Sequence, residues 1–469
     1  MNTLGKNNRR EFIQKFGAAS LGLSFFPSKK EGLKNAQELP WDFPQKNNET
    51  FSPNDHIQLA TIGLGIQGHY DTRAALKNAG VKLVAGCDLY EGRLEGAKEI
   101  FETDLFCTRD YREILEREDI DAVIIATSDH WHQKIAIDAL KAGKAVYCEK
   151  PMVQRIEEGA DLIEAWKQSG KVLQVGSQRV SSIVYAKAGE LFRSGAIGSL
   201  VLAEISNDRH SAIGAWNYSI PTDASLETVD WDRFLGHAPQ RSFDATRFFR
   251  WRNYQDYGTG VPGDMFVHFF SGLHVMTGSL GPSRIYATGG LRYWNDGRDV
   301  PDIVMGSFDY AETPNLPEFN VAMRVNFADG AGGGSVFRLV GTEGVMEISG
   351  GGVKLKRNPL PEAPGFGGYD SVFTWDKARQ KDFEEAYRIK YPSRPIIQEP
   401  ALAEYKAPQS YSEHIDHFWN FFDAMRNDGK VVEDPEFGMR AAGPALASSI
   451  SAQEKRIVGW NPQTIELLK

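Results

Sequence analysis

The sequence predicts an α/β protein in which an N-terminal, doubly wound parallel sheet precedes a C-terminal α/β domain with an open-faced, mostly antiparallel sheet. Two observations predict it. Over residues 54–178, short strands that are apolar throughout alternate with amphipathic helices, which is typical of a parallel sheet covered on both faces. Over residues 179–469, longer strands alternate apolar and polar residues, which is typical of a sheet with one covered face.

The composition is that of a folded, acidic protein. Its 469 residues are 41% hydrophobic and 25% charged, and the formal charge is −9. Because residues 1–34 are basic, the rest of the chain is more acidic still, and we exclude nucleic acid and anionic membrane surfaces as partners. The three cysteines are too few and too dispersed for a disulfide framework.

Residues 1–34 have the layout of a signal peptide. Basic residues precede a short apolar run, 16–26, which is too short to span a bilayer as a helix. Arg9 and Arg10 resemble the twin-arginine type of signal, which exports folded proteins. The alternative is a basic N-terminus without targeting function. We therefore expect an exported, periplasmic protein with no membrane span in the mature chain, and a linker over 35–53.

A glycine-rich turn, GLGIQG, separates the first expected strand of residues 54–178 from the first helix. Gly63, Gly65 and Gly68 match the Rossmann dinucleotide-binding fingerprint. In it the glycines permit a tight turn, close approach of a pyrophosphate to the backbone, and close contact between helix and strand. The sequence therefore predicts a nucleotide site at this turn.

Asp88 ends the second expected strand, about 20 residues beyond the glycine turn, where a carboxylate can bind the ribose hydroxyls of an adenosine. The alternative is that Asp88 caps the next helix. The carboxylate favours NAD, and the nearby Arg93 leaves NADP open. Since ligands gather where parallel strands end, the expected cofactor-binding residues lie there. They are Gly63, Gly65, Ile66, Gln67, Gly68, Asp88, Arg93, Thr127, Ser128, His132, Glu149 and Lys150.

Three residues are suited to hydride chemistry, which needs a group that takes the proton of a hydroxyl as the hydride leaves. Lys150 ends an apolar strand and is followed by Pro151. Asp264 and His268 are four residues apart, so a helix would place both on one face, where a carboxylate can support an imidazole. The alternatives are a surface lysine, a helix-capping aspartate and a packed histidine.

From about residue 57 to its C-terminus the chain resembles the glucose-fructose oxidoreductase, inositol dehydrogenase and rhizopine catabolism (Gfo/Idh/MocA) family. The resemblance rests on the glycine turn and on TSDHWH (127–132), AGKAVYCEKP (142–151), GSQRV (176–180), SGAIG (194–198), GDMFVH (263–268) and the closing helix (414–426). It implies that His268 transfers the proton, Asp264 assists in substrate binding and Lys150 polarises the reacting hydroxyl, although either Lys150 or His268 could take the proton. Ser128 and Ser271 depart from the proline and aspartate that many relatives have there.

The C-terminal half provides the expected substrate site. We expect sheet strands at 200–210, 283–294, 302–310, 319–327 and 335–349, a long arm or loop over 353–410, and a core helix over 411–427. The resemblance implies that this sheet covers the nicotinamide and forms a homo-oligomer, a dimer or tetramer.

Aromatic and polar residues are interleaved over 248–260, a combination that suits the apolar faces and hydroxyl rim of a pyranose. The alternative is an aromatic packing cluster. The expected substrate residues are Gln178, Arg179, His210, Trp251, Arg252 and Tyr254. We expect no metal, since His130 and His132 lack a carboxylate or cysteine at a supporting spacing.

These features predict an NAD(P)-dependent oxidoreductase that transfers a hydride between a carbinol of a sugar or sugar derivative and a tightly bound nicotinamide. Export favours tight binding, because no diffusing pool of NAD is expected outside the cytoplasm. The same reasoning supports an alternative, a redox-neutral glycosidase, lyase or epimerase that acts through a transient keto-sugar. A sugar-binding protein without catalysis is the third alternative.

Overall fold

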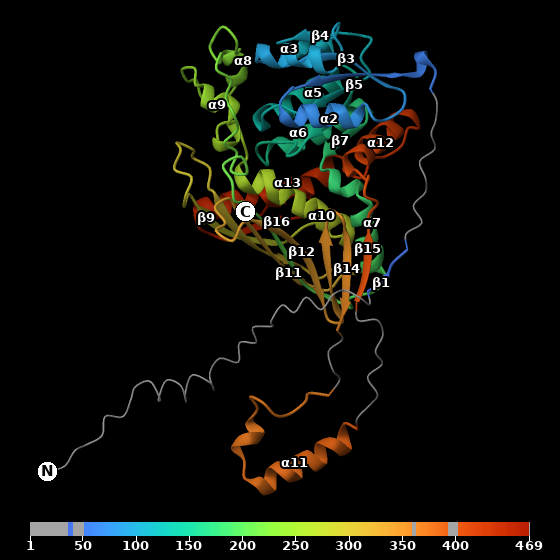
Figure 1. Ribbon diagram of the computed structural model, residues 1–469, viewed down its shortest axis with the longest axis vertical. Coiled ribbons are helices and arrows are strands. Elements are labelled where there is room, and N and C mark those ends of the chain that lie inside the picture. Colours follow the sequence, from blue (N-terminus) through green and yellow to red (C-terminus); the bar gives the residue numbers. More distant parts are fainter. Residues whose placement is uncertain (1–35, 41–50, 359–362, 393–401, 469) are drawn as a thin grey trace, which may run out of the picture.

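The computed structural model describes residues 36–40, 51–358, 363–392 and 402–468. Two sheets dominate it, with helices between them and around the first (Figure 1). The expected signal peptide and most of the expected linker lie outside the described residues. Within the described ranges, no helix is both long and apolar enough to cross a membrane.

The N-terminal sheet has six parallel strands in the order β4-β3-β2-β5-β6-β7. Its central strands are apolar because helices cover both faces, and every residue of Ala122–Ile125 is buried. The doubly wound parallel sheet is therefore confirmed. The strands are β2 (Ile57–Ile62), β3 (Val81–Cys87), β4 (Phe106–Thr108), β5 (Ala122–Ile125), β6 (Ala145–Glu149) and β7 (Leu173–Gly176). The helices are α2 (Ile66–Ala75), α3 (Glu91–Ile100), α4 (Tyr111–Leu115), α5 (His132–Lys141) and α6 (Glu158–Ser169).

The second sheet has eleven strands within the described ranges, in the order β1-β15-β14-β13-β12-β8-β11-β10-β9-β16-β17. Pairing is mostly antiparallel, as expected; the pairs β8–β11 and β1–β15 are parallel. Burial alternates strictly along Phe319–Val325, so helices cover one face only. The strands are β1 (Gln37–Glu38), β8 (Leu200–Asp208), β9 (Arg284–Gly290), β10 (Ile303–Tyr310), β11 (Phe319–Asn326), β12 (Gly334–Gly341), β13 (Gly344–Ser349), β14 (Gly352–Arg357), β15 (Leu402–Lys406), β16 (Val458–Asn461) and β17 (Glu466–Leu467).

Three expectations for this sheet were wrong in detail. The single strand expected over 335–349 is the hairpin of β12 and β13, because the apolar–polar alternation continues on both sides of a short turn. The arm expected over 353–410 contributes β14 and β15 to the sheet and the helix α11 (Lys377–Lys390), which Figure 1 shows apart from both sheets. The expected linker supplies β1, whose Gln37 pairs with Ala403.

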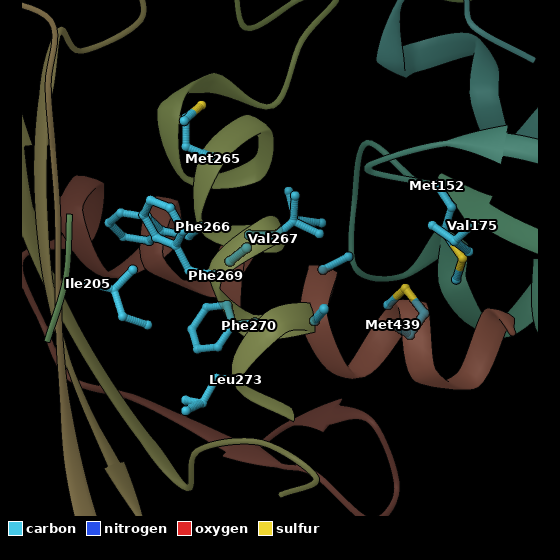
Figure 2. Close-up of a cluster of buried hydrophobic side chains, with 14 of the residues drawn as sticks. Met152, Val175, Ile205, Met265, Phe266, Val267, Phe269, Phe270, Leu273 and Met439 are labelled. Carbon is cyan, nitrogen blue, oxygen red and sulfur yellow. The ribbon is translucent and has the colours of Figure 1, made fainter. Parts of the chain in front are cut away.

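The covered face of the large sheet packs on α7 (Ile183–Arg193), α10 (Val267–Thr277) and α13 (Pro435–Glu454). Figure 2 shows Phe269 and Phe270 directed toward Ile205 of β8. On the other side, Met439 of α13 lies near Met152 and Val175, which belong to the N-terminal domain. One continuous core therefore joins the two domains.

The helix α12 (Glu413–Arg426) belongs in sequence to the expected C-terminal domain but packs on the N-terminal sheet. Phe418 stacks on Tyr147 of β6 with ring centroids 4.1 Å apart. Phe421 and Phe422 are buried in the same cluster, against strands β2, β5 and β6. The helix α12 thus covers part of one face of the first sheet (Figure 1).

The remaining helical segments connect these layers. The α-helical ones are α8 (Trp231–Leu235) and α9 (Ala245–Phe249). The short 3-10 turns are η1 (Pro53–Asp55), η2 (Asp129–Trp131), η3 (Gln178–Ser181), η4 (Trp251–Asn253) and η6 (Ser371–Thr374), and η5 (Pro262–Phe266) is a π-helical turn that leads into α10.

Candidate active site

A cavity of about 460 Å³ lies at the carboxyl ends of the N-terminal strands and extends to the C-terminal domain. Its nucleotide end is lined by the glycine turn, Asp88 and Arg93. Its other end, which we call the substrate end, is lined by Lys150, Asp264 and further residues of both domains. Binding at the carboxyl ends of parallel strands is the rule for doubly wound sheets.

Backbone geometry dictates the glycine turn. Gly63 has φ +94°, and a Cβ there would lie 2.5 Å from the carbonyl oxygen of Ala126. A Cβ on Gly68 would lie 1.9 Å from the carbonyl oxygen of Gly63, so α2 could not pack as closely on β2. Gly65 caps α2 without a side-chain hydrogen bond, which leaves the first N–H groups of the helix for an anion. This cradle fits a pyrophosphate.

Asp88 is held at the end of β3 by the backbone. Its Oδ2 accepts a hydrogen bond from the Leu64 N–H (2.8 Å), and its Oδ1 accepts one from the Tyr90 N–H (3.0 Å). Arg93 Nη1 lies 3.4 Å from the carboxylate. A fixed carboxylate at the cavity wall fits a ribose diol, and because Arg93 is already paired with it, the arrangement fits NAD better than a 2′-phosphate.

At the substrate end, Lys150 and Asp264 form an ion pair although they are 114 residues apart. Lys150 Nζ donates to Asp264 Oδ1 and to the Asp264 carbonyl oxygen, both at 3.0 Å. Arg252 Nε lies 3.3 Å from the same Oδ1. Burial by itself would raise the pKa of Asp264, but Lys150 and Arg252 hold that pKa well below its usual range. Asp264 is therefore an anion that keeps the ammonium in place.

His268 follows Asp264 across the junction of η5 and α10. Burial lowers the pKa of His268 well below its usual value, and the neighbouring charges of Lys150 and Arg179 lower it further. The imidazole is therefore neutral. His268 lines the cavity, and among the described residues its buried Nδ1 has no hydrogen-bond partner.

Asp264 supports His268 electrostatically, since it raises the pKa of that imidazole, but no hydrogen bond is found between them within the described residues. The carboxylate bonds to Lys150 and Arg252 instead. The reason is the π-helical turn, which contains more residues than an α-helical turn and so does not stack positions four apart in the same way. Such turns are frequent at functional sites.

Two buried carboxyl groups lie behind Lys150. Glu149 Oε1 accepts hydrogen bonds from Gln178 Nε2 (2.8 Å) and Gln67 Nε2 (3.2 Å). Gln67 also donates to Asp71 Oδ1 (2.9 Å). Burial raises the pKa of Glu149 and that of Asp71, and the Glu149 carboxylate raises the pKa of Asp71 further through repulsion. Nothing in the sequence pattern pointed to Asp71.

The cavity brings together most of the predicted residues. Thr127, Ser128, Glu149, Gln178 and Arg179 line it with the catalytic candidates. Trp251 and Arg252 line it as well, and the guanidinium of Arg252 lies 4.2 Å from the centre of the Trp251 ring.

Four predicted site residues do not line the cavity: Gly68, whose place is the contact between α2 and the glycine turn, and His132, His210 and Tyr254. His132 is buried, with its ring nitrogens near the carbonyl oxygens of Pro151 (2.7 Å) and Thr127 (3.2 Å), so it holds the loop behind the wall. His210 is exposed, because it follows Arg209 in extended chain and successive side chains point in opposite directions. Tyr254 is packed in an aromatic cluster, with Arg247 stacked on its ring.

Sequence reasoning also missed lining residues. Arg209, Trp216, Tyr218 and His414 contribute to the wall. For Arg209 the position at the end of β8, beside the selected His210, was a usable signal; the others follow no recognisable pattern. Within the described ranges, no cluster of three His, Cys, Asp or Glu side chains could hold a metal.

Comparison with known proteins agrees with this geometry. Residues 57–177 match the model of the family described as the oxidoreductase family with an NAD-binding Rossmann fold, Gfo/Idh/MocA. Inositol 2-dehydrogenase from Salmonella typhimurium is 31% identical over 175 residues, which are 37% of this chain and 51% of that protein. The scyllo-inositol 2-dehydrogenase (NAD⁺) from Bacillus subtilis is 34% identical over 143 residues, 30% of this chain and 42% of that protein.

The chain thus spans about half the length of these curated relatives. The structural likeness extends further. A solved structure of levoglucosan dehydrogenase with NADH and levoglucosan covers 86% of this chain and 99% of its own, at 20% identity and a TM-score of 0.59. The similarity of fold therefore includes the C-terminal sheet. Residues 57–177 thus match the Gfo/Idh/MocA oxidoreductase family, and the likeness of fold extends over both sheets.

Proposed function

We propose that the protein is an NAD-dependent oxidoreductase that transfers a hydride between a carbinol carbon of a sugar or cyclic polyol and a bound nicotinamide. One observation carries the proposal: Lys150, Asp264 and His268 line the same cavity as the glycine turn and Asp88. Relatives that are named inositol and levoglucosan dehydrogenases support this class of substrate. They favour net oxidation over the redox-neutral alternative.

NAD, held by the glycine turn, the α2 N-terminus and Asp88, would supply the hydride acceptor. Lys150, held in place by Asp264, donates a hydrogen bond to the reacting oxygen and stabilises negative charge that develops there. The neutral His268, which lines the same cavity, accepts the hydroxyl proton. This division of roles assigns the proton to His268, because an ammonium held by a carboxylate has no proton vacancy.

A two-part experiment tests the proposal. Mass spectrometry of small molecules released from the purified protein identifies the nucleotide, and sugars and inositols are then added to the intact protein while reduced nicotinamide is followed by absorbance. We expect NAD and substrate-dependent reduction, which Lys150→Met abolishes. Retention of NADP would overturn the choice of cofactor. A sugar consumed equally fast by wild type and Lys150→Met would overturn the catalytic assignment.

We further propose that the protein is exported with its nucleotide bound, on the support of the basic segment and apolar run in residues 1–34. The test is fractionation of cells that produce the full chain or the Arg9→Lys, Arg10→Lys variant. Accumulation of only the wild type in the periplasm is expected, and equal distribution of both would contradict the proposal.

A homo-oligomer formed through the open face of the large sheet is a related proposal. Val201, Tyr286, Met305 and Val336 expose apolar side chains on four of its strands, each about half accessible. Such a patch favours association. Light scattering on the purified protein should report a dimer or tetramer, and Met305→Glu should shift it toward the monomer; a monomeric wild type would contradict this.

A further inference from the structure

The arginines that line the cavity fall into two groups. At the nucleotide end, Arg93 pairs with Asp88 (3.4 Å), and Arg109 pairs with Glu91 (2.9 Å). Arg233, which also lines the cavity, pairs with Asp230 at 2.7 Å. Each of these guanidinium groups thus has a carboxylate partner of its own protein.

Two arginines of the substrate end differ. Within the described ranges, neither Arg179 nor Arg209 has a carboxylate within ion-pair distance. Arg179 donates to the Tyr185 hydroxyl (2.6 Å). Arg209 donates to the carbonyl oxygen of Gly214 (2.9 Å) and the side-chain oxygen of Asn207 (3.2 Å), and its remaining contact is the Met265 sulfur (3.1 Å), a weak acceptor. All of these hydrogen-bond partners are neutral; the carboxylate of Glu413, which also lines the cavity, acts on Arg179 electrostatically without an ion pair.

Both arginines lie close to the reacting groups. Arg179 is among the charges that lower the pKa of His268, and Arg209 is among those that lower the pKa of Asp264. The two come from distant segments, the η3 turn after β7 and the end of β8, and both line the cavity. The carboxylate of Asp264 forms its ion pairs with Lys150 and Arg252, and its attraction for Arg209 is without direct contact.

The phosphates of NAD do not account for the positive charge of Arg179 and Arg209. The glycine turn and the α2 N-terminus, which would hold them, are at the other end of the cavity, where further arginines are available. Half-buried cations without an ion-pair partner are costly, and the planar guanidinium fork matches an oxyanion. The positive charge of these two arginines therefore favours a ligand that carries a negative charge.

We propose that the substrate is an anionic sugar, with its oxyanion group bound by Arg179 and Arg209 while a carbinol meets Lys150 and His268. This inference rests on the proposed function and narrows its substrate class. A carboxylate is the oxyanion that a single guanidinium fork matches best, which favours uronic or other sugar acids; a sulfate or phosphate ester shares the same chemistry.

The test compares matched sugars on the purified protein with its nucleotide bound. Each hexuronate (glucuronate, galacturonate, mannuronate) is paired with its uronamide, which has nearly the same shape and no charge, and with the parent hexose. The 6-sulfate and 6-phosphate esters form two further arms. For at least one acid, we expect kcat/KM to exceed that of its amide by about tenfold or more, as for hydrogen bonds between charged groups. A preference for an ester over every acid would overturn the assignment to a carboxylate.

Arginine variants locate the effect. In Arg209→Gln and Arg179→Gln the ratio of acid to amide should fall toward one. In Arg209→Lys, which keeps the charge and loses the fork, it should fall only partly. The control is Arg324→Gln, since Arg324 is exposed on the sheet and pairs with Asp208; it should keep the wild-type ratio. An unchanged ratio in both pocket variants would overturn the site.

The experiment separates a failure of the anionic-sugar site from a failure of the proposed oxidoreductase activity. If hexoses or uronamides reduce the nicotinamide as well as the acids do, the anionic site is wrong and the oxidoreductase stands. If no sugar reduces it, the oxidoreductase is wrong, and calorimetric titration of the same acids and amides decides the anionic site. Tighter binding of an acid than of its amide, lost in Arg209→Gln, supports the site; equal binding overturns it.

Discussion

The two ends of the cavity are built differently. The nucleotide end is made of backbone: a left-handed glycine, a close helix–strand contact and free N–H groups within one short segment. The substrate end is made of side chains from segments far apart in the sequence, such as Lys150 and Asp264. The first end is dictated by local sequence, and the second exists only when the whole chain has folded. Changes at the two ends should therefore damage different functions.

The largest expected effect belongs to the substrate end. Lys150→Met removes the charge at the reacting oxygen, and we expect kcat to fall by about 10²–10⁴-fold, the range of a single acid–base or charge-stabilising group. The bound nucleotide should be retained. Steady-state kinetics and mass spectrometry of the bound nucleotide measure the two properties, and loss of the nucleotide together with activity would show that the ends are not separable.

At the nucleotide end, Gly68→Ala should have the opposite effect. The new Cβ would clash with the Gly63 carbonyl oxygen, and overpacking of this kind costs about 1–3 kcal/mol. We expect the bound nucleotide to be lost. Gly96→Ala is the matched control, since a Cβ there meets no atom within 4 Å and Gly96 is also helical. Equal nucleotide content in the two variants would contradict the backbone account of this end.

A smaller effect is expected for Asp88→Ala. It removes the acceptor for a ribose hydroxyl, and we expect NAD to bind about tenfold more weakly, the loss of roughly one charge-assisted hydrogen bond. Discrimination against NADP should decrease too, because Arg93 loses its partner. Fluorescence titration of nucleotide-free protein with both nucleotides measures this. Unchanged preference would mean that Asp88 only orders the turn through Leu64 and Tyr90.

The pH profile sharpens the account of the substrate end. Because burial and nearby cations keep the pKa of His268 well below 6.5, the base is neutral through the mildly acidic range. We expect kcat/KM to show no acidic decline near pH 6.5 and to decline only at lower pH. A profile that falls with a midpoint near 6.5 or above would indicate an ordinary, exposed histidine as the base.

The smallest effect concerns stability away from the reacting groups. His417 is fully buried, with hydrogen bonds at Ser181 and Val175, and burial lowers its pKa to about 4. Below pH 6.5 the unfolded chain binds a proton that the folded chain does not. The free energy of unfolding should therefore fall between about pH 6.5 and pH 4, and His417→Gln should reduce this slope. Urea unfolding at several pH values tests it, and identical slopes would contradict it.

The same contrast explains how much the sequence could predict. The parallel sheet was predictable strand by strand, because a buried strand such as Ala122–Ile125 is apolar throughout. The hairpin at β12 and β13 was not, since its turn does not interrupt the alternation. The helix α13 was missed because its buried face is made of small residues such as Ala441 and Ala445, which give little hydrophobic periodicity.

For the site, the residues marked by a strand end or a motif were predicted, among them Gly63, Asp88 and Lys150. Asp71 reaches its position only through tertiary packing, whereas Arg209 follows the end of β8 and could have been selected beside His210. The exchange of partners at Asp264 could not be predicted either, because it depends on a π-helical turn that no local pattern signals. The sequence thus identified the segments that supply chemistry better than it identified how their side chains pair.

The most direct measurement of the central claim is the fate of hydrogen on the substrate carbon. Sugar acids deuterated at every carbon are mixed with the purified protein. The nucleotide is then released, and its mass is measured by mass spectrometry. The account predicts that deuterium appears on the nicotinamide in wild type and not in Lys150→Met. A transformed sugar beside an unlabelled nucleotide would contradict hydride transfer in this cavity.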